Sequence, residues 1–249
     1  MKKKLAILIS LLFVASTFGV ASVLGKSGGP DNFGYTFIDS NDDPQLKSYY
    51  PWIEIKDTGT KVTSWAGGCD DGSVYNIPLG FNFKFYGRSI SQVEIVANGY
   101  IYLGPANDFI YAFSRDLYPC CADSGVYYET KVIGGRKVFV LEYYQVPLYG
   151  DAYCSNYRNT FQLQLHEGSN NIVMVYKTLD PAIISGNIGI YKNDPLDQLF
   201  YSSGPTNYVI PSDGTVIIFQ YPGSQRYPLS RTLPMHQILK ILKENKDKE

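Results

Sequence analysis

Short strand signals separated by glycine-containing turns recur through the sequence and limit its fold more than any other feature. The runs Val93–Val96 and Tyr100–Leu103 are rich in β-branched and aromatic residues, and they flank the dipeptide Asn98-Gly99. Asn-Gly tolerates the positive φ angles of a tight hairpin turn, so this stretch predicts two antiparallel strands. We expect the aromatic side chains of this hairpin to fill the core between two sheets.

The same pattern continues toward the C-terminus. Gly134-Gly135 lies between two apolar runs, and further strand signals follow at intervals of about eight to fifteen residues. The runs are Gly125–Thr130, Lys137–Tyr143, Phe161–Leu165, Ile172–Tyr176, Asn187–Tyr191 and Thr215–Tyr221. Little of the chain between residue 26 and Pro234 has helical periodicity. The sequence therefore predicts an all-β fold over residues 26–225, a two-sheet antiparallel β-sandwich that is jelly-roll-like.

The N-terminus has the features of an export signal. Lys2–Lys4 form a basic segment, Leu5–Leu24 is apolar, and small residues follow. This pattern predicts a signal peptide over residues 1–25, with cleavage after Ala21 or Gly25, or a retained N-terminal anchor, since the motif fits both. In either case the rest of the chain is exported, so the expected location is secreted or at the cell surface.

The cysteines of the chain are Cys69, Cys120, Cys121 and Cys154. An even number of cysteines in an oxidising compartment predicts disulfide bonds. A bond between the neighbours Cys120 and Cys121 would be strained, so we expect one of them to pair with Cys69 and the other with Cys154. The alternative is a zinc site, but the sequence has no C-x-x-C pair, and its two histidines occupy unrelated contexts.

An ordered series of segments resembles a known extracellular module. Between Asp31 and Gln220 the chain contains "DNFGYTFIDS", "PLGFNFKFYG", "VEIVANGYIYLG", "GVYYET", "KVFVLEYYQVPLYG", "NTFQLQLHEGSNNIVMVYK" and "GNIGIYKND". The series resembles a β-sandwich module of secreted bacterial and archaeal proteins, often appended to exported proteases and cell-surface proteins. Its middle portion is similar to the NIDO domain of nidogen-type extracellular proteins. The resemblance implies a non-catalytic module, in which the segment "SRDLYPCCADS" departs from the family pattern as a local stabilising addition.

Few groups suited to catalysis occur in the sequence. The single G-x-S-x-G match, residues 25–29, lacks the preceding strand and following helix of a nucleophile elbow, and we interpret it as a flexible linker. Glu94, Glu129 and Glu142 could pair as glycosidase carboxylates, but alternation within strands predicts that they face solvent. We therefore expect no enzyme activity and no catalytic residues, with an unrecognised extracellular hydrolase as a second alternative.

A short acidic segment is the candidate metal site. Asp39, Asn41 and Asp43 stand at alternate positions, as the first three ligands of many calcium loops do. The glycine and terminal glutamate of a helix-loop-helix site are missing, so only a looser site that borrows Asp70 or Asp71 fits. The alternative is a turn whose side chains bond their own backbone. Calcium is the only cofactor that the sequence suggests.

Residues 226–249 are expected to form a separate tail. Pro234 can start a helix, and apolar residues follow at helical spacing. These residues are Met235, Ile238, Leu239 and Leu242. We expect a short C-terminal amphipathic helix that packs on the sandwich, with docking to a partner or an anionic surface as the alternative.

Charge limits the partners that we expect. Residues 26–225 carry 13 basic and 20 acidic side chains, and such an acidic body argues against nucleic acid. We expect a non-catalytic module for adhesion or extracellular assembly that binds a cell-surface protein or polysaccharide, and a membrane only if the N-terminal segment is retained. The alternative is a carbohydrate-binding module. Exposed coplanar aromatic rings would favour sugar binding, whereas a long unpaired edge strand would favour assembly by strand addition.

Overall fold

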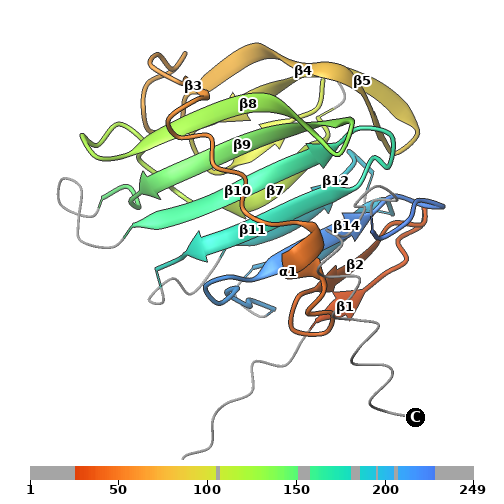
Figure 1. Cartoon of the computed structure of the whole chain (residues 1–249). Coiled ribbons are helices and arrows are strands. Elements are labelled where there is room, and N and C mark those ends of the chain that lie inside the picture. Colours follow the sequence, from red (N-terminus) through yellow and green to blue (C-terminus); the bar gives the residue numbers. More distant parts are fainter. Residues whose placement is uncertain are drawn as a thin grey trace, which may run out of the picture.

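Two β-sheets packed face to face make up the fold (Figure 1). The computed structural model describes residues 26–104, 107–150, 158–180, 186–194, 196–204 and 207–227. Every strand pair within these sheets is antiparallel, so the predicted antiparallel sandwich is confirmed. The predicted export signal and the predicted C-terminal helix lie outside the described residues.

The larger sheet has eight strands in the order β1-β2-β14-β11-β10-β9-β8-β3. In chain order these are β1 (Ser27–Gly28), β2 (Thr36–Asp39), β3 (Thr60–Lys61), β8 (Gly125–Ile133), β9 (Arg136–Val146), β10 (Asn159–His166), β11 (Ile172–Thr178) and β14 (Val216–Gln220). The smaller sheet has six strands in the order β13-β12-β7-β6-β5-β4. They are β4 (Ser73–Phe85), β5 (Arg88–Val96), β6 (Tyr100–Tyr102), β7 (Phe109–Ser114), β12 (Asn187–Tyr191) and β13 (Gln198–Ser202).

Tight turns keep successive strands side by side. Ile133 pairs with Arg136, so Gly134-Gly135 is a two-residue turn, and both glycines have the positive φ angles (59° and 79°) that such a turn requires. The strands β4 to β7 are consecutive neighbours in the smaller sheet, and β8 to β11 are consecutive neighbours in the larger one. The jelly-roll expectation is therefore wrong, because a jelly roll is built from two Greek keys and these sheets are built around meanders.

Buried aromatic residues fill the space between the sheets and also tie them together. Tyr143 on β9 stacks on Phe161 on β10 with ring centroids 4.7 Å apart. The Tyr143 hydroxyl donates a 2.5 Å hydrogen bond to the backbone carbonyl of Val96 on the opposite sheet. Tyr176 on β11 makes the equivalent 2.6 Å bond to the carbonyl of Ala112 on β7. The two phenols thus satisfy their polar ends across an otherwise apolar core.

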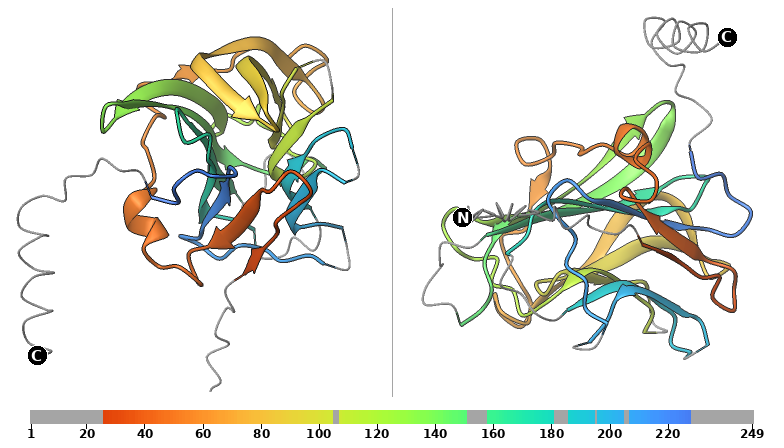
Figure 2. Two further views of the ribbon diagram at one scale, coloured as in Figure 1. Left: turned by 90° about the vertical axis from the view of Figure 1, so that its right-hand side faces the viewer. Right: turned by 90° about the horizontal axis from the view of Figure 1, so that it is seen from below.

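A segment without regular structure crosses the outer face of the larger sheet. Residues 51–57, here called the strap, run from the helix α1 (Leu46–Tyr49) toward β3 (Figure 1). In Figure 2 the strap and α1, in orange, lie on the opposite side of the larger sheet from β12 and β13, in cyan. Gln162 on β10 holds the strap through both backbone groups of Ile53, at 3.2 Å and 2.7 Å, and Gln164 donates to the carbonyl of Pro51 at 3.1 Å.

The strap buries the polar residues that lie below it. Gln162, Gln164 and Glu142 all have zero solvent exposure. The prediction that Glu142 faces solvent is therefore wrong, because a segment distant in sequence covers this part of the outer face. Ile55 of the strap packs there with the outward-facing Val138 and Val140 of β9.

The first described residues belong to the sheet. Ser27 and Gly28 form β1 and pair with Ile38 and Phe37 of β2. The interpretation of residues 25–29 as a flexible linker is therefore wrong for this part of the motif, and no helix follows it that could complete a nucleophile elbow. In the part of the chain that the structure describes, no helix has the length and apolar character needed to cross a membrane.

Candidate functional site

Aromatic side chains gather on the outer face of the smaller sheet. Strand register sets the first row: Tyr102 on β6 pairs with Phe109 on β7, and Phe109 pairs with Tyr191 on β12. The same row continues to Glu94 on β5 and Gln198 on β13, which pair with Tyr102 and Tyr191 respectively. Three aromatic rings therefore stand side by side across the strands, with a polar residue at each end of the row.

A second row lies one side-chain repeat along the strands. Tyr100 on β6 pairs with Tyr111 on β7, Tyr111 pairs with Gly189 on β12, and Gly189 pairs with Phe200 on β13. A Cβ atom on Gly189 would lie 2.6 Å from the Phe200 ring, so glycine leaves the space that this ring occupies. The ring of Phe200 instead stacks toward Tyr111, with centroids 6.0 Å apart.

The two rows form one continuous aromatic face. It comprises Tyr100, Tyr102, Phe109, Tyr111, Tyr191 and Phe200, all of them partly exposed to solvent. Phe109 is its centre, with ring centroids 4.3 Å from Tyr102, 5.3 Å from Tyr111 and 5.9 Å from Tyr191. The planes of Phe109 and Tyr111 differ by only 7°. Since strands lie about 4.8 Å apart, the face extends about 14 Å from β6 to β13.

The hydroxyls of Tyr100 and Tyr111 on this face stay neutral over the ordinary pH range. Partial burial, with the neighbouring Tyr102 as the next cause, raises the pKa of Tyr100 to about 12. The same two causes raise the pKa of Tyr111 to about 12. Neutral phenols can both donate and accept hydrogen bonds, so the face combines apolar ring surface with polar edges.

A polar groove of about 590 Å³ adjoins the aromatic face on its β4 and β5 side. Tyr100 and Tyr102 line it together with carboxylates, amides and a further tyrosine that is 56% exposed. These further residues include Asp71, Tyr75, Asn76, Gln92, Glu94 and Asn107. The volume lies within the range of small-molecule sites, and the lining supplies hydroxyl, amide and carboxylate groups at the end of a row of rings.

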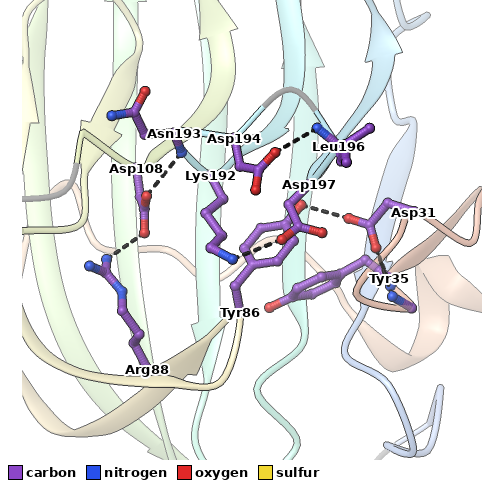
Figure 3. Close-up of polar contacts among 11 residues, drawn as sticks. Asp31, Tyr35, Tyr86, Arg88, Asp108, Lys192, Asn193, Asp194, Leu196 and Asp197 are labelled. Carbon is purple, nitrogen blue, oxygen red and sulfur yellow. Dashed lines mark hydrogen bonds and ion pairs between the residues drawn. The ribbon is translucent and has the colours of Figure 1, made fainter.

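Ion pairs lie at the strand ends next to the first row (Figure 3). Arg88 at the start of β5 forms an ion pair with Asp108, which is 1% exposed and precedes Phe109. Lys192, which follows Tyr191, forms an ion pair with Asp197 at 2.8 Å. The turn between β12 and β13 is thereby fixed, because Asp108 also accepts a 3.2 Å hydrogen bond from the backbone of Asn193.

The sequence did not predict this face, although a signal for it is present. We expected the aromatic residues of the hairpin to fill the core, and for Tyr100 and Tyr102 this is wrong because they point outward. The spacing Tyr100-x-Tyr102 and Phe109-x-Tyr111 places rings at alternate positions of two strands, and alternate residues share one face of a sheet. Periodicity shows that the rings lie together but does not show on which side of the sheet.

The predicted calcium residues lie in a turn after β2, where their oxygens already have partners. Asp39 is fully buried; it accepts hydrogen bonds from the backbone of Asn41 and Asp42 at 2.9 Å and 3.1 Å, and from the Tyr201 hydroxyl at 2.9 Å. Asp43 points instead toward the end of the described chain. This arrangement corresponds to the alternative of a turn that bonds its own backbone.

Asp43, Asp70 and Asp71 add no further ligand to that turn. Asp43 accepts a 3.0 Å bond from Arg226 and a bond from the Tyr227 hydroxyl. Asp70 and Asp71 belong to the region of the Cys69 disulfide and the polar groove. Within the described ranges no group of three or more His, Cys, Asp or Glu side chains is placed to hold a metal ion. The calcium site stays a prediction.

A disulfide bond joins Cys69 to Cys120, with Cα atoms 5.9 Å apart. Cys121 is also disulfide-bonded, and no cysteine of the described residues is free. Cys154 lies outside the described residues. The bond to Cys120 links the segment before β4 to the loop before β8, and so connects the two sheets covalently at one end of the sandwich.

His166 is the last residue of β10, and its surroundings do not resemble those of a catalytic base. Burial lowers the pKa of His166 to about 4, so its ring stays neutral above that pH. Its Nε2 atom lies 3.3 Å from the Gln164 amide oxygen, and its ring packs edge-on against Tyr50. The group that His166 contacts through Nε2 is therefore an amide, which is not a nucleophile. His236 lies outside the described residues.

The chain was compared with models of protein families, with curated proteins and with solved structures. A family model described as NIDO related matches residues 45–225, which include α1, the strap, the disulfide and every strand of the aromatic face. No curated protein and no solved structure matches the chain. The match spans well over half of the chain and covers the region for which the sequence showed a NIDO-like resemblance. The chain belongs to the NIDO-related family.

Proposed function

We propose that the chain is a non-catalytic module of the cell surface or the secreted fraction that adheres to carbohydrate through its aromatic face. One observation carries the proposal: six aromatic rings lie in mutual contact on a solvent-facing side of the smaller sheet. Monomeric proteins rarely leave contiguous apolar surface of this kind without a partner. The predicted export signal, the disulfide and the family support an extracellular setting.

Carbohydrate suits this face better than an apolar partner does. One side of a sugar ring presents C–H groups, which pack on aromatic rings, while its edge presents hydroxyls that need hydrogen-bond partners. The aromatic face supplies rings in a row, and the polar groove beside it supplies amides and carboxylates. The length of about 14 Å favours an oligosaccharide or polysaccharide over a single sugar.

Assembly by strand addition is the second candidate, because β4 is a long strand at the edge of the smaller sheet. Its pairing with β5 is interrupted by register shifts between Val74 and Ile77 and between Pro78 and Phe83. Two backbone carbonyls of β4 already accept hydrogen bonds from side chains of the larger sheet. Thr130 donates to the carbonyl of Leu79 at 2.9 Å, and Lys137 donates to the carbonyl of Gly80 at 2.6 Å. Bulges, proline and occupied carbonyls all hinder the pairing of a further strand with an edge. Strand addition at β4 is therefore less favoured than carbohydrate binding at the aromatic face.

The placement of two carboxylates supports the proposal that the module is non-catalytic. Glu129 on β8 and Glu142 on β9 are diagonal neighbours on one face, since Tyr127 pairs with Glu142 and Glu129 with Val140. Such a pair could in principle serve a glycosidase. Glu142, however, is fully buried beneath the strap. A carboxylate without access to substrate supports a structural role.

The experiment is a binding titration against polysaccharides with single substitutions in the face. Tyr102→Ala and Tyr191→Ala each remove a ring from the first row, and each should weaken binding at least tenfold while the melting temperature shifts little. Tyr144→Ala is the matched control, because this half-buried tyrosine lies on the opposite sheet under Lys56. Equal loss of binding in all three variants, or none in the first two, would refute the proposal.

A further inference from the structure

We infer that the aromatic face selects neutral glycans and discriminates against anionic ones. The inference rests on the proposed function and goes one step further, because it names the chemical class of the ligand from the charges around the face. The relevant charges lie in three places: the polar groove, the ion pairs at the strand ends beside the first row, and the exposed part of β4.

The polar groove is negatively charged. Among the described residues that line it, Asp71 and Glu94 are carboxylates and none is lysine or arginine. Glu94 stands directly beside Tyr102 in the strand register, at the end of the first aromatic row. A sugar unit that extends from the Tyr102 ring into the groove therefore lies next to the Glu94 carboxylate. Carboxylate oxygens accept hydrogen bonds from sugar hydroxyls, but they repel a carboxylate or sulfate on the ligand.

The cations near the face are already neutralised. Arg88 is engaged by Asp108 and the carbonyl of Leu103, and Lys192 is engaged by Asp197. Figure 3 shows both cationic side chains directed toward these carboxylates. A ligand anion would have to compete with a partner that is almost fully buried in each case, since Asp108 is 1% and Asp197 6% exposed. Asp194 in the same turn adds a further carboxylate that is partly exposed and accepts a hydrogen bond from the backbone of Leu196.

Lys84 is the remaining cation on the outer side of β4. It pairs with Ser89 on β5, whereas the groove begins at Gln92, three residues farther along the same strand. At about 3.3 Å per residue this is a separation of about 10 Å, comparable with the Debye length at about 0.1 M salt. Lys84 therefore contributes little attraction at the groove, where Asp71 and Glu94 make the local field negative.

The test compares a neutral polysaccharide with the same polymer carrying carboxylates. Hydroxyethylcellulose, galactomannan and laminarin serve as neutral probes, and each is also oxidised at its primary hydroxyls to give the matched anionic probe. The purified protein is titrated with all six probes by calorimetry at low salt and at about 1 M salt, where the Debye length is about 3 Å. We expect the oxidised form of a bound polymer to bind at least fivefold more weakly at low salt, and the difference to shrink at high salt.

Glu94→Gln should reduce this discrimination by about threefold to fivefold, because one exposed charge interaction has that magnitude. The discrimination is taken as the ratio of the affinities for the neutral and the oxidised polymer, so a change in affinity for the neutral polymer is separated from the loss of charge repulsion. Glu129→Gln is the matched control on the other sheet and should keep the full discrimination. If the oxidised polymer binds as tightly as its parent, or if Glu94→Gln changes nothing, the selectivity is overturned while the proposed function stands. If no neutral probe binds, or if Tyr102→Ala leaves neutral binding intact, the proposed function fails as well.

Discussion

The amide of Gln162 donates a 2.9 Å hydrogen bond to the carboxylate of Glu142 on the neighbouring strand, beneath the strap. Gln162 also bonds the strap itself through Ile53, so it connects the buried acid to the segment that covers it. The second carboxylate oxygen of Glu142, Oε1, is buried without a side-chain or backbone hydrogen bond of normal geometry. The ionised form of Glu142 is therefore poorly stabilised in the folded protein.

The first prediction is that Glu142 makes folding pH-dependent. Burial raises the pKa of Glu142 from its ordinary value of 4.5 to about 7, and Glu54 adds to the rise, whereas the Gln162 amide and Lys177 oppose it. Between pH 4.5 and 7 the folded state binds the proton more tightly than the unfolded state, so stability should fall as pH rises through this window. It should level off above pH 7. Denaturant titrations across this range would measure the change.

Glu142→Gln should remove most of the decrease in stability that the wild type shows as pH rises from 4.5 to 7. Glutamine keeps an oxygen that can accept the bond from Gln162 but carries no charge to bury, so the variant should be more stable than the wild type at pH 8. Glu94→Gln, on the exposed face of the other sheet, should retain the slope. A wild-type stability that rises between pH 5 and 7 would contradict the role of Glu142.

The strap also shows where sequence reasoning stops. The alternation in Phe161–Leu165 correctly predicts a strand, because the side-chain period of two is a local property. It does not show that Gln162 and Gln164 are buried, since the segment that covers them comes from residues 51–57, more than a hundred positions earlier in the chain. The hairpins at Asn98-Gly99 and Gly134-Gly135 were predictable for the opposite reason: turn chemistry acts within a few residues.

The aromatic face was missed for a related reason. Tyr100 and Tyr102 have the same spacing whether they point into the core or away from it, and strand propensity favours aromatic residues on either face. Only the placement of the second sheet decides between the two sides. The strands β1 and β3 were also unpredictable, because two residues carry too little pattern to distinguish a strand from a loop.

The second prediction concerns the disulfide between Cys69 and Cys120, which closes a loop with a sequence separation of 51. By the chain-entropy relation, a loop of this length is worth about 4 kcal/mol of stability. The double substitution Cys69→Ser with Cys120→Ser should therefore lower the free energy of unfolding by about 2–4 kcal/mol. Thiol titration of the unfolded, unreduced wild type should find no free thiol. Two free thiols there, or an unaltered stability in the double variant, would count against this account.

The third prediction separates the calcium site from the turn. Asp39 accepts three hydrogen bonds while fully buried, so Asp39→Ala should destabilise the protein by about 1–3 kcal/mol with or without calcium. Saturating calcium should leave the melting temperature of the wild type unchanged, because a ligand stabilises only a folded state that binds it. Asp42→Ala, on the exposed side of the same turn, is the control. A calcium-dependent rise in melting temperature that Asp39→Ala abolishes would establish the metal site instead.

The last prediction concerns how the chain ends. Arg226 and Tyr227, the first residues of the predicted tail, pack on the sandwich: the Tyr227 ring lies 4.3 Å from that of Tyr49, and both residues bond Asp43. A chain that ends at residue 225 should therefore be about 1–3 kcal/mol less stable than one that ends at Tyr227, because it loses a ring contact and leaves a carboxylate without its partners.

Comparison of the full chain with the chain ending at Tyr227 then isolates residues 228–249. If the predicted helix packs on the sandwich, burial of its leucine, isoleucine and methionine side chains at about 1.5–3 kcal/mol each should make the full chain clearly more stable. We expect this outcome. Equal melting temperatures for the two chains would refute packing, and loss of co-sedimentation with cell envelopes in the shorter chain would show that the tail docks to a partner surface. Because the aromatic face lies on the smaller sheet and Tyr227 packs beside α1 on the outer side of the larger one, polysaccharide binding should be the same in both chains.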